Sequence, residues 1–555
     1  MPITINAKCL DCGKTAPYDP DSHKCPFCGG EWREAQYAYR DISKKLEDNL
    51  KNRAFDLWRY SELLPTQAKL PDISLGEGGT PLLKANNLGM MLGRSNIYIK
   101  DERQGPTASF KDRQAAVTIA ALKEAGITEM VVASTGNVAI SYSAYAARAG
   151  IKLWAFLTSR VPVEKMREVA LYGTQVVKVT GSYDQTKKIA SEFAQKRGVF
   201  YDLGARSIPC VEAMKTIAFE AAEQLTQRLG TAQSHPWQSP DWYIQSVSGG
   251  MGPLGVLKGF AELKEMGFIG KIPKAAIIQA EGCAPMVHAW KQNQATAVPV
   301  RAPRTHIETL ATGDPGRTYT LLREKMMAAS GGIFESVTDE ETFRAIHFMA
   351  KMEGISVEPA AAVAIAGLIK LVRAGTIKPD ELVVINCTGH TMPVESLILG
   401  EGWSKDIDAS SSFAQETEQE GLLAALSHVA SDRYPRVAIV DDNPEARRLI
   451  RRILQSQGEY TLFEAANGRE ALELARNEQP NLIILDLMMP ELDGFGVLEA
   501  LQSQPETAEI PVIVVTAKEL TPMEKDRLRG RVKSLMQKGD FMNNDLEDEV
   551  RSLLG

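Results

Sequence analysis

The sequence lacks the features of a membrane-spanning or secreted protein. No apolar run is long enough to cross a bilayer, and residues 1–10 lack the charged and then apolar pattern of a signal peptide. A basic excess is also missing, because the formal net charge at pH 7 is -7. We therefore expect a cytoplasmic protein that binds no membrane and does not have nucleic acid as its main partner.

Cysteine is scarce, with seven in 555 residues. In a reducing cytosol we expect the three scattered ones to be free core thiols: Cys210, Cys283 and Cys387. The other four form two Cys-x-x-Cys-Gly pairs near the N-terminus: Cys9, Cys12, Cys25 and Cys28. The glycine after each pair allows the tight turn that directs two sulfurs at one ion. We predict a structural Zn²⁺ held by all four thiolates; the alternatives are a disulfide pair or a ribbon that has lost its metal.

The chain is too long for a single core, and four compositional regions follow one another. Residues 1–35 form the predicted zinc ribbon, which lacks clustered Lys and Arg, so we expect it to have a packing role. Residues 36–402 alternate short apolar runs with helical patterns, as parallel sheets covered by helices do. Residues 403–434 have the composition of a linker, and residues 435–555 begin a second alternation of strands and helices.

Lys111 is the candidate catalytic residue, within the run Thr-Ala-Ser-Phe-Lys-Asp-Arg at 107–113. A lysine that forms a Schiff base needs a fixed backbone and surroundings that favour its neutral form. If that is the role of Lys111, the chain is a pyridoxal phosphate enzyme. The alternative is an ordinary surface lysine that begins a helix over 112–125.

The context of Lys111 resembles the threonine synthases, fold-type II pyridoxal phosphate enzymes of the tryptophan synthase β family. The strings that carry the resemblance occur in order at 58–60, 75–82, 98–102, 106–113, 133–137, 358–360 and 388–390. Many members of this family also carry a short N-terminal zinc ribbon. The resemblance implies an α/β fold with two doubly wound subdomains, and a homodimer.

The resemblance also implies roles for individual residues. Lys111 would hold the cofactor, Asn137 would bind its ring hydroxyl, and Thr388 would face its ring nitrogen. Ser134 and Thr135 lie in a strand-to-helix turn that can hold a substrate carboxylate. Amides free of side chains can surround the cofactor phosphate in the loop made of Ser248, Gly249, Gly250, Met251 and Gly252.

The sequence departs from the family pattern at three places. Ala108 and Gln114 stand where glycines are usual, and the phosphate loop has a different sequence. Cys210 occupies the expected place of an arginine that helps to hold the substrate phosphate, and Arg206 is a candidate replacement. Cofactor binding is therefore better supported than the identity of the substrate.

The C-terminal region places polar residues where its predicted strands end. Asp441 and Asp442 follow the strand 437–440, and Asp486 follows the strand 482–485. Carboxyl ends of parallel strands meet at one edge of a sheet, and three carboxylates there call for a divalent cation such as Mg²⁺. Asp486 is then the predicted site of phosphorylation, and Thr516 and Lys538 would bind the phosphoryl oxygens.

Together with the run Met-Pro-Glu-Leu-Asp-Gly at 489–494, these residues resemble a response-regulator receiver domain, a flavodoxin-like (βα)5 fold. We expect phosphorylation by a cognate histidine kinase or phosphotransfer protein to regulate the enzyme half. The leading hypothesis for that half is conversion of O-phospho-L-homoserine and water to L-threonine and phosphate. The alternatives are a cysteate synthase-like or serine/threonine dehydratase-like enzyme, and a non-catalytic signalling protein that senses an amino acid.

Overall fold

A computed structural model describes residues 5–66, 73–230, 235–390, 435–457, 460–518, 520–537 and 545–554. The predicted linker at 403–434 and Lys538 lie outside these residues. The chain forms two compact units, of which the first comprises Met1–Ala85, Asn96–Ile346 and Ser356–Pro393. The second comprises Asn86–Ser95, His347–Ile355 and Val394–Gly555. Among the described helices, none is long and apolar enough to cross a membrane.

The N-terminal segment of the first unit forms a small antiparallel sheet of order β2-β1-β3. Its strands are β1 (Asn6–Cys9), β2 (Thr15–Pro17) and β3 (Arg33–Gln36). Two helical segments follow, α1 (Tyr39–Leu50) and the 3-10 helix η1 (Leu57–Leu63). Each Cys-x-x-Cys pair ends at a glycine in the left-handed region, Gly13 at φ 71° and Gly29 at φ 75°. This is the turn for which the sequence pattern requires glycine.

A six-stranded sheet of order β12-β11-β10-β13-β5-β4 forms the larger subdomain. Its strands are β4 (Leu82–Lys84), β5 (Ile97–Asp101), β10 (Trp242–Ser246), β11 (Lys274–Ala280), β12 (Gly332–Val337) and β13 (Val383–Cys387). All neighbours pair in parallel except β4 with β5. Residues of the central strands β10 and β13 are buried throughout, as expected for a sheet covered on both faces.

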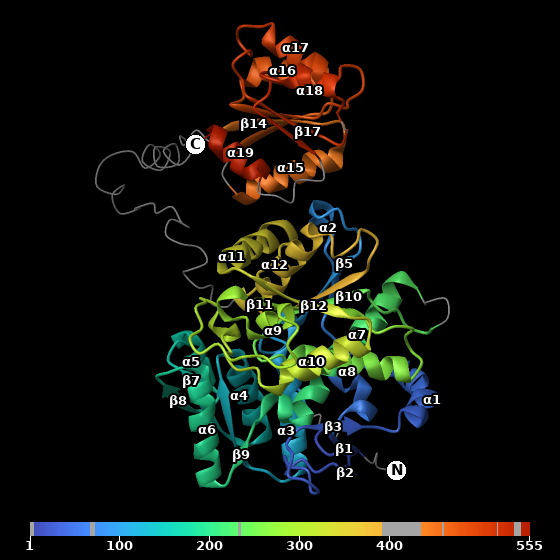
Figure 1. The fold of residues 1–555 in the computed structure, drawn as a ribbon, viewed down its shortest axis with the longest axis vertical. Coiled ribbons are helices and arrows are strands. Elements are labelled where there is room, and N and C mark those ends of the chain that lie inside the picture. The colour runs from blue at the N-terminus through green and yellow to red at the C-terminus, as the bar shows by residue number, and fades with distance from the viewer. Residues whose placement is uncertain are drawn as a thin grey trace, which may run out of the picture. The chain divides into compact units, whose positions relative to one another are not determined.

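Helices cover both faces of this sheet, with α11 and α12 on one side and α7, α8 and α10 on the other (Figure 1). The helices of this part are α7 (Ile208–Leu229), α8 (Met251–Glu265), α9 (Pro285–Lys291), α10 (Arg317–Ala328), α11 (Asp339–Phe348) and α12 (Pro359–Arg373). Shorter segments of the first unit are η2 (Glu102–Gln104), η3 (Gly204–Arg206), η4 (Glu281–Cys283) and η5 (Glu308–Leu310). Two short segments, α2 (Asn86–Met91) and the π-helical turn η6 (Met349–Glu353), belong to the second unit.

The smaller subdomain is a parallel sheet of order β8-β7-β6-β9. Its strands are β6 (Glu129–Ser134), β7 (Lys152–Thr158), β8 (Gln175–Val179) and β9 (Phe200–Tyr201). Its helices are α3 (Lys111–Glu124), α4 (Asn137–Ala149), α5 (Val163–Leu171) and α6 (Tyr183–Arg197). Small buried residues on α3 and α4, such as Ala115, Ala116 and Ala139, let these helices pack closely in the core.

The C-terminal part of the second unit is a five-stranded parallel sheet of order β15-β14-β16-β17-β18. Its strands are β14 (Arg436–Val440), β15 (Thr461–Ala465), β16 (Leu482–Leu485), β17 (Val512–Thr516) and β18 (Ser534–Gln537). Its helices are α15 (Pro444–Gln457), α16 (Gly468–Glu478), α17 (Gly494–Gln502), α18 (Pro522–Leu528) and α19 (Asp545–Leu554). Buried residues on both faces of its strands form two core clusters, so helices cover the sheet on both sides.

Candidate active site

A cavity of about 660 Å³ in the first unit is lined by the ends of β6, β10 and β13 and the first residues of α3, α4, α8, α10 and α12. Ten of the predicted site residues line it: Lys111, Thr135, Asn137, Arg206, Ser248, Gly249, Gly250, Met251, Gly252 and Thr388. Ser134 does not line it and is 1% exposed. The Ser134 hydroxyl instead accepts hydrogen bonds from the amides of Gly136 (3.0 Å) and Ala139 (3.1 Å), which fixes the turn into α4.

Lys111 begins α3 and is held at a backbone junction with the end of β13. The Phe110 amide donates to the Thr388 carbonyl over 3.0 Å, and Ser109 forms an isolated bridge with Gly389. Loss of hydration lowers the pKa of Lys111 to about 8, against the opposing effects of Cys210, Asp202 and Glu358. At pH 7 about a tenth of the molecules then carry the neutral amine, the form that attaches an aldehyde.

Arg113 does not line the pocket and instead anchors the start of α3. Arg113 is 1% exposed and pairs with Glu102 (2.8 Å) and Glu220 (2.6 Å). Lys100 also binds Glu220, over 2.6 Å. Burial raises the pKa of the Glu220 carboxyl, but the Arg113 and Lys100 charges outweigh this and lower it to about 2. The two cations and two carboxylates thus balance in the interior and tie α3 to β5 and α7.

Asn137 lies at the first position of α4 and is held from two sides. Its side-chain amide donates to both carboxylate oxygens of Glu358 at 2.9 Å, and its carbonyl oxygen accepts from Lys165 Nζ over 3.1 Å. Lys165 Nζ is also 3.7 Å from Glu358. Gly389 makes room for Glu358, because a Cβ at position 389 would lie 2.5 Å from Glu358 Oε1. These contacts fix the orientation of the Asn137 amide at the pocket.

The glycine loop joins β10 to α8. Gly250 adopts φ 85°, and a Cβ there would lie 2.9 to 3.0 Å from Leu322, Met286 and Thr318. A Cβ on Gly252 would lie 2.4 Å from Gln245 Nε2, whereas one on Gly249 would meet nothing within 4 Å. Gly249 therefore leaves its backbone open to the pocket at the start of a 15-residue helix, where the first N–H groups lack partners within the helix.

A buried polar cluster adjoins the pocket, and two of the departures from the family pattern are part of it. Gln114 Nε2 donates to Asp202 Oδ2 over 3.2 Å and lies 3.6 Å from Cys210 Sγ. The Cys210 thiol donates to Asp202 Oδ1 over 3.2 Å. Burial, followed by the charge of Asp202, raises the pKa of this thiol to about 12, so it stays protonated. Cys210 is therefore a hydrogen-bonding core thiol and holds no anion.

Pyridoxal phosphate suits this set of residues. A lysine with a lowered pKa faces a pocket that also contains an open glycine backbone at a helix N-terminus and a threonine at a strand end. The helix terminus favours a phosphate group, and the lysine can hold an aldehyde.

Comparison with known proteins agrees with this geometry. Residues 73–389 match the family model of the pyridoxal-phosphate dependent enzymes. The chain is 37% identical to a threonine synthase of Methanocaldococcus jannaschii over 385 residues, covering 69% of this chain and 91% of the relative. A threonine synthase of Methanosarcina acetivorans is 34% identical over 386 residues, which again cover 69% of this chain and 91% of the relative.

The chain belongs to the threonine synthase family of pyridoxal-phosphate dependent enzymes. The enzyme class and the fold-type II expectation are thereby confirmed. Among solved structures, the holo diaminopropionate ammonia lyase of Escherichia coli covers 72% of this chain and 98% of its own, with a TM-score of 0.50 at 14% identity. Residues 437–551 match the response regulator receiver domain, which confirms that part of the fold as well.

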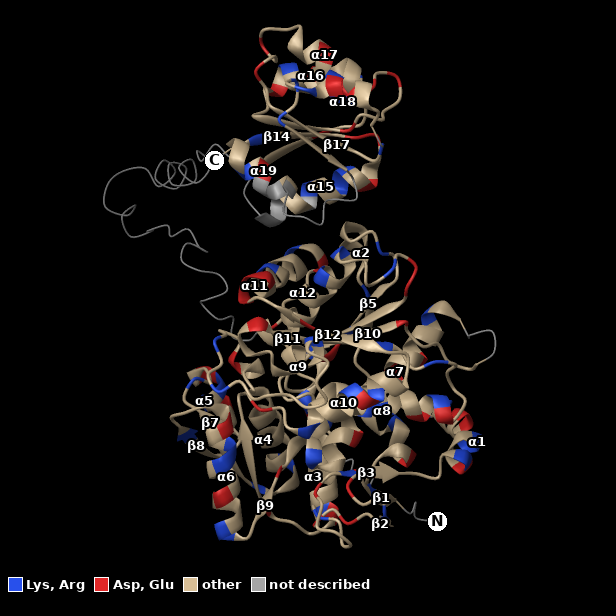
Figure 2. Ribbon diagram, in the orientation of Figure 1, with Lys and Arg blue, Asp and Glu red and all other residues tan. Residues whose placement is uncertain are grey.

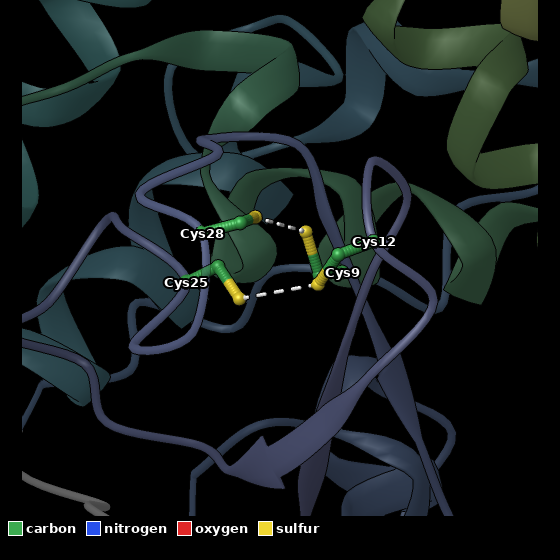
Figure 3. A group of neighbouring side chains, drawn as sticks. All are labelled: Cys9, Cys12, Cys25 and Cys28. Atoms are coloured by element: carbon green, nitrogen blue, oxygen red, sulfur yellow. Dashed lines mark hydrogen bonds between the residues drawn. The ribbon is translucent and has the colours of Figure 1, made fainter.

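The four N-terminal cysteines of this chain converge as their spacing predicts. The four Sγ atoms lie within 4.8 Å of one another, and the thiols point toward one another (Figure 3). The Cys9 and Cys28 sulfurs are 3.6 Å apart, and those of Cys12 and Cys25 are 3.8 Å apart. These separations are too long for disulfides and suit four thiolates around one tetrahedral Zn²⁺.

The receiver carboxylates also converge. Oxygens of Asp441, Asp442 and Asp486 lie within 4.8 Å of one another at the carboxyl ends of β14 and β16. Asp441 and Asp486 are buried and Asp442 is exposed. Thr516 ends β17 and is 1% exposed, whereas Lys538 lies outside the described residues. Three carboxylates this close suit a divalent cation bound by oxygen.

Several residues in or next to the pocket had no role in the sequence interpretation. Glu358 and Lys165 hold Asn137, and the charge of Asp202, which lines the cavity, raises the pKa of Lys111. Trp32 of the ribbon and Arg317 of α10 also line the cavity. The Glu-Pro string at 358–359 was a usable signal for Glu358, but the other four residues come from segments with no motif.

Both signs of charge occur along surface helices such as α1 and α6 (Figure 2), in keeping with the absence of a basic excess.

Proposed function

We propose that this protein converts O-phospho-L-homoserine and water to L-threonine and phosphate. The observation that carries the proposal is the convergence of Lys111, the glycine loop and Thr388 in one pocket of a chain that is 37% identical to a threonine synthase. In this reaction the Cγ–O bond breaks, phosphate leaves with the bonding electrons and Cβ loses a proton. Water then supplies a hydroxyl group to Cβ and a proton to Cγ.

The proposed roles follow from the positions of the side chains. Bound pyridoxal phosphate would supply an electron sink for the negative charge that develops at the substrate Cα. The Lys111 amine takes the proton from Cα and moves protons at the neighbouring carbons, a task that suits a pKa of about 8.

The other site residues bind and orient. The open backbone at Gly249 and the first turn of α8 hold the cofactor phosphate, Asn137 its ring hydroxyl and Thr388 its ring nitrogen. Thr135 and the amides at the start of α4 are placed to hold the substrate carboxylate. Ser134 supports that turn from behind through its two hydrogen bonds to backbone amides.

A substrate panel tests the assignment. The purified protein, loaded with cofactor, is given O-phosphohomoserine, O-phosphoserine with sulfite, and threonine, each at the same concentration. We expect phosphate release from O-phosphohomoserine, and none from the Lys111→Ala variant. Preference for either of the other substrates would replace the assignment by a cysteate synthase-like or dehydratase-like one. A cofactor absorbance band without turnover of any of the three would favour an amino-acid sensor.

We further propose that the receiver regulates this activity. Asp441, Asp442 and Asp486 hold Mg²⁺, a cognate histidine kinase or phosphotransfer protein phosphorylates Asp486, and Thr516 and Lys538 bind the phosphoryl group. The boundaries proposed for the parts are 1–35, 36–402, 403–434 and 435–555, and the enzyme half acts as a homodimer. The convergence of the three carboxylates supports the magnesium site.

A further inference from the structure

Two arginines that line the pocket are each paired with an acid of the ribbon. Arg206, at the end of η3, forms a salt bridge with Glu31. Arg317, the first residue of α10, forms a salt bridge with Asp11 and also donates from Nη2 to the Leu10 carbonyl over 3.1 Å. The ribbon thus contacts both arginines that line the pocket.

The cysteine pairs fix the backbone that carries these acids. Asp11 lies inside the first pair, and its amide donates to Cys9 Sγ over 3.4 Å. Glu31 follows the second pair, where the Gly30 amide donates to Cys28 Sγ over 3.4 Å. Side-chain atoms of Asp11 pack against Gly30, because a Cβ at position 30 would lie 2.1 Å from Asp11 Oδ2. The two acids therefore lie close together, and a filled metal site would hold both.

The ribbon also contributes directly to the pocket wall. Trp32 lines the cavity, and its carbonyl accepts from the Leu10 amide over 2.9 Å, which joins the two segments that carry the acids. The four side chains of the two ion pairs are 34% to 38% exposed. Pairs this exposed contribute little to folding stability, so their main effect is to restrict the arginine side chains. A guanidinium paired on one edge keeps further N–H donors for an anion.

We propose that Asp11 and Glu31 are positioning residues that hold Arg317 and Arg206 for the phosphate group of the substrate. This inference rests on the proposed function, which supplies the phosphorylated amino acid. It also accounts for Cys210: the family arginine is missing from the interior, and two arginines held by the ribbon supply the anion contact at the pocket instead. The zinc ribbon is then part of the substrate site.

The experiment compares holoenzymes of the wild type, the Asp11→Asn/Glu31→Gln variant and a matched control. The control is Glu34→Gln, which removes another ribbon acid whose partner, Lys325 at 2.8 Å, lies outside the pocket lining. Inorganic phosphate is the probe, and its Kd is measured by calorimetry. We expect about a tenfold weaker Kd in the double variant and no change in the control. Cofactor absorbance and Tm should match the wild type in both.

Three further readouts separate positioning from a structural role. With O-phosphohomoserine, KM should rise about tenfold in the double variant while kcat changes less than twofold. The charge-conserving variant Asp11→Glu/Glu31→Asp should recover at least part of the phosphate affinity. Removal of zinc with a chelator should weaken phosphate binding while the cofactor band remains. An unchanged or tighter phosphate Kd in the double variant, or the same loss in Glu34→Gln, would overturn the inference.

The phosphate Kd also distinguishes this inference from the proposed function. A protein that turns over no phosphorylated amino acid, yet loses phosphate affinity only in the Asp11→Asn/Glu31→Gln variant, would contradict the proposed substrate and leave the anion site in place. Turnover of O-phosphohomoserine with an unaltered KM in that variant would contradict the ribbon's role and leave the reaction in place.

Discussion

Gln114 Nε2 lies 3.6 Å from Cys210 Sγ, so two positions that depart from the family pattern are in contact. The side chain is larger than the usual glycine at 114 and smaller than the usual arginine at 210. Both share the carboxylate of Asp202, and both are buried, at 2% and 0% exposure. The two departures form one packing unit in which one side chain fills the space that the other leaves.

This contact predicts that Cys210→Arg alone is destabilising. The new side chain would overlap with Gln114, and we expect a loss of about 3 kcal/mol in the free energy of unfolding. Adding Gln114→Gly should restore much of it, because Asp202 can then pair with the arginine. A double-mutant cycle by denaturant unfolding measures the coupling, expected at about 1–3 kcal/mol. Additive effects of the two substitutions would contradict the packing account.

Ala108 adopts φ 57°, a left-handed conformation that costs a residue with a Cβ about 1 kcal/mol. We therefore predict that Ala108→Gly stabilises the protein, because glycine adopts this conformation without strain. The greater conformational entropy of glycine in the unfolded chain offsets part of this gain. The backbone bonds on either side, Ala108 N to Gly105 O at 2.9 Å and His390 N to Ala108 O at 3.0 Å, remain available. The measurement is Tm, with Ala125→Gly as a control at φ -75° that should destabilise.

The lowered pKa of Lys111 predicts how cofactor attachment depends on pH. The neutral amine is the reactive form, so the rate at which apoprotein takes up pyridoxal phosphate should rise about fivefold from pH 7 to 8 and about twofold from 8 to 9, for a pKa of about 8. Stopped-flow absorbance measures this rate. A rate that keeps rising in proportion to hydroxide beyond pH 9 would indicate an ordinary lysine pKa.

The same pKa has a consequence for stability. Because the folded pKa of Lys111 lies below the ordinary value of 10.5, its charged form opposes folding at neutral pH, and this penalty falls as pH rises from about 8 toward 10.5. Apoprotein carrying Lys111→Met should therefore have a higher Tm than the wild type at pH 7, with a difference that shrinks at pH 10. A constant difference across this range would contradict the burial of a titrating amine.

Lys165 is predicted to act on the cofactor through Asn137. Its removal in Lys165→Met takes away one of the two contacts that hold the Asn137 amide and leaves Glu358 without this cation, and we expect the Kd for pyridoxal phosphate to rise about fivefold to tenfold. Equilibrium titration of apoprotein measures this Kd. Lys152→Met, which removes a half-exposed lysine paired with Glu129, is the control and should not change it.

The receiver gives a further prediction. Acetyl phosphate with Mg²⁺ should label Asp486 and change the kinetics or the oligomeric state of the enzyme half, and Asp486→Asn should abolish both effects. Labelling is followed by intact-protein mass. If the Asp486→Asn variant and the wild type show the same activity and assembly under phosphorylating conditions, the regulatory link fails.

Local sequence patterns predicted much of the fold because its strands are continuous apolar runs. The strand predicted at 482–485 matches β16, and the apolar residues at 129–133 lie within β6, which continues for one residue more. The sequence pattern of a helix runs over 339–352, but α11 ends at Phe348 and a π-helical turn follows from Met349. Side-chain periodicity does not reveal this change in hydrogen bonding, because the apolar face continues through the turn.

The site was predictable only where a motif marked it. Lys111 and the glycine loop lie in recognisable sequence motifs, and the spacing of the four cysteines is typical of a zinc site. The pairs Arg206–Glu31 and Arg317–Asp11 join residues 175 and 306 positions apart, so no local pattern connects them. Ser134 illustrates the same limit, since no local pattern shows that its hydroxyl oxygen accepts two hydrogen bonds from the turn into α4.

The most direct test of the central proposal is the simultaneous measurement of L-threonine and phosphate formed from O-phospho-L-homoserine by the cofactor-loaded protein. We expect both products to appear in equal amounts over the wild-type time course and Lys111→Ala to form neither. Cofactor-loaded wild-type protein that forms no phosphate or threonine would contradict it.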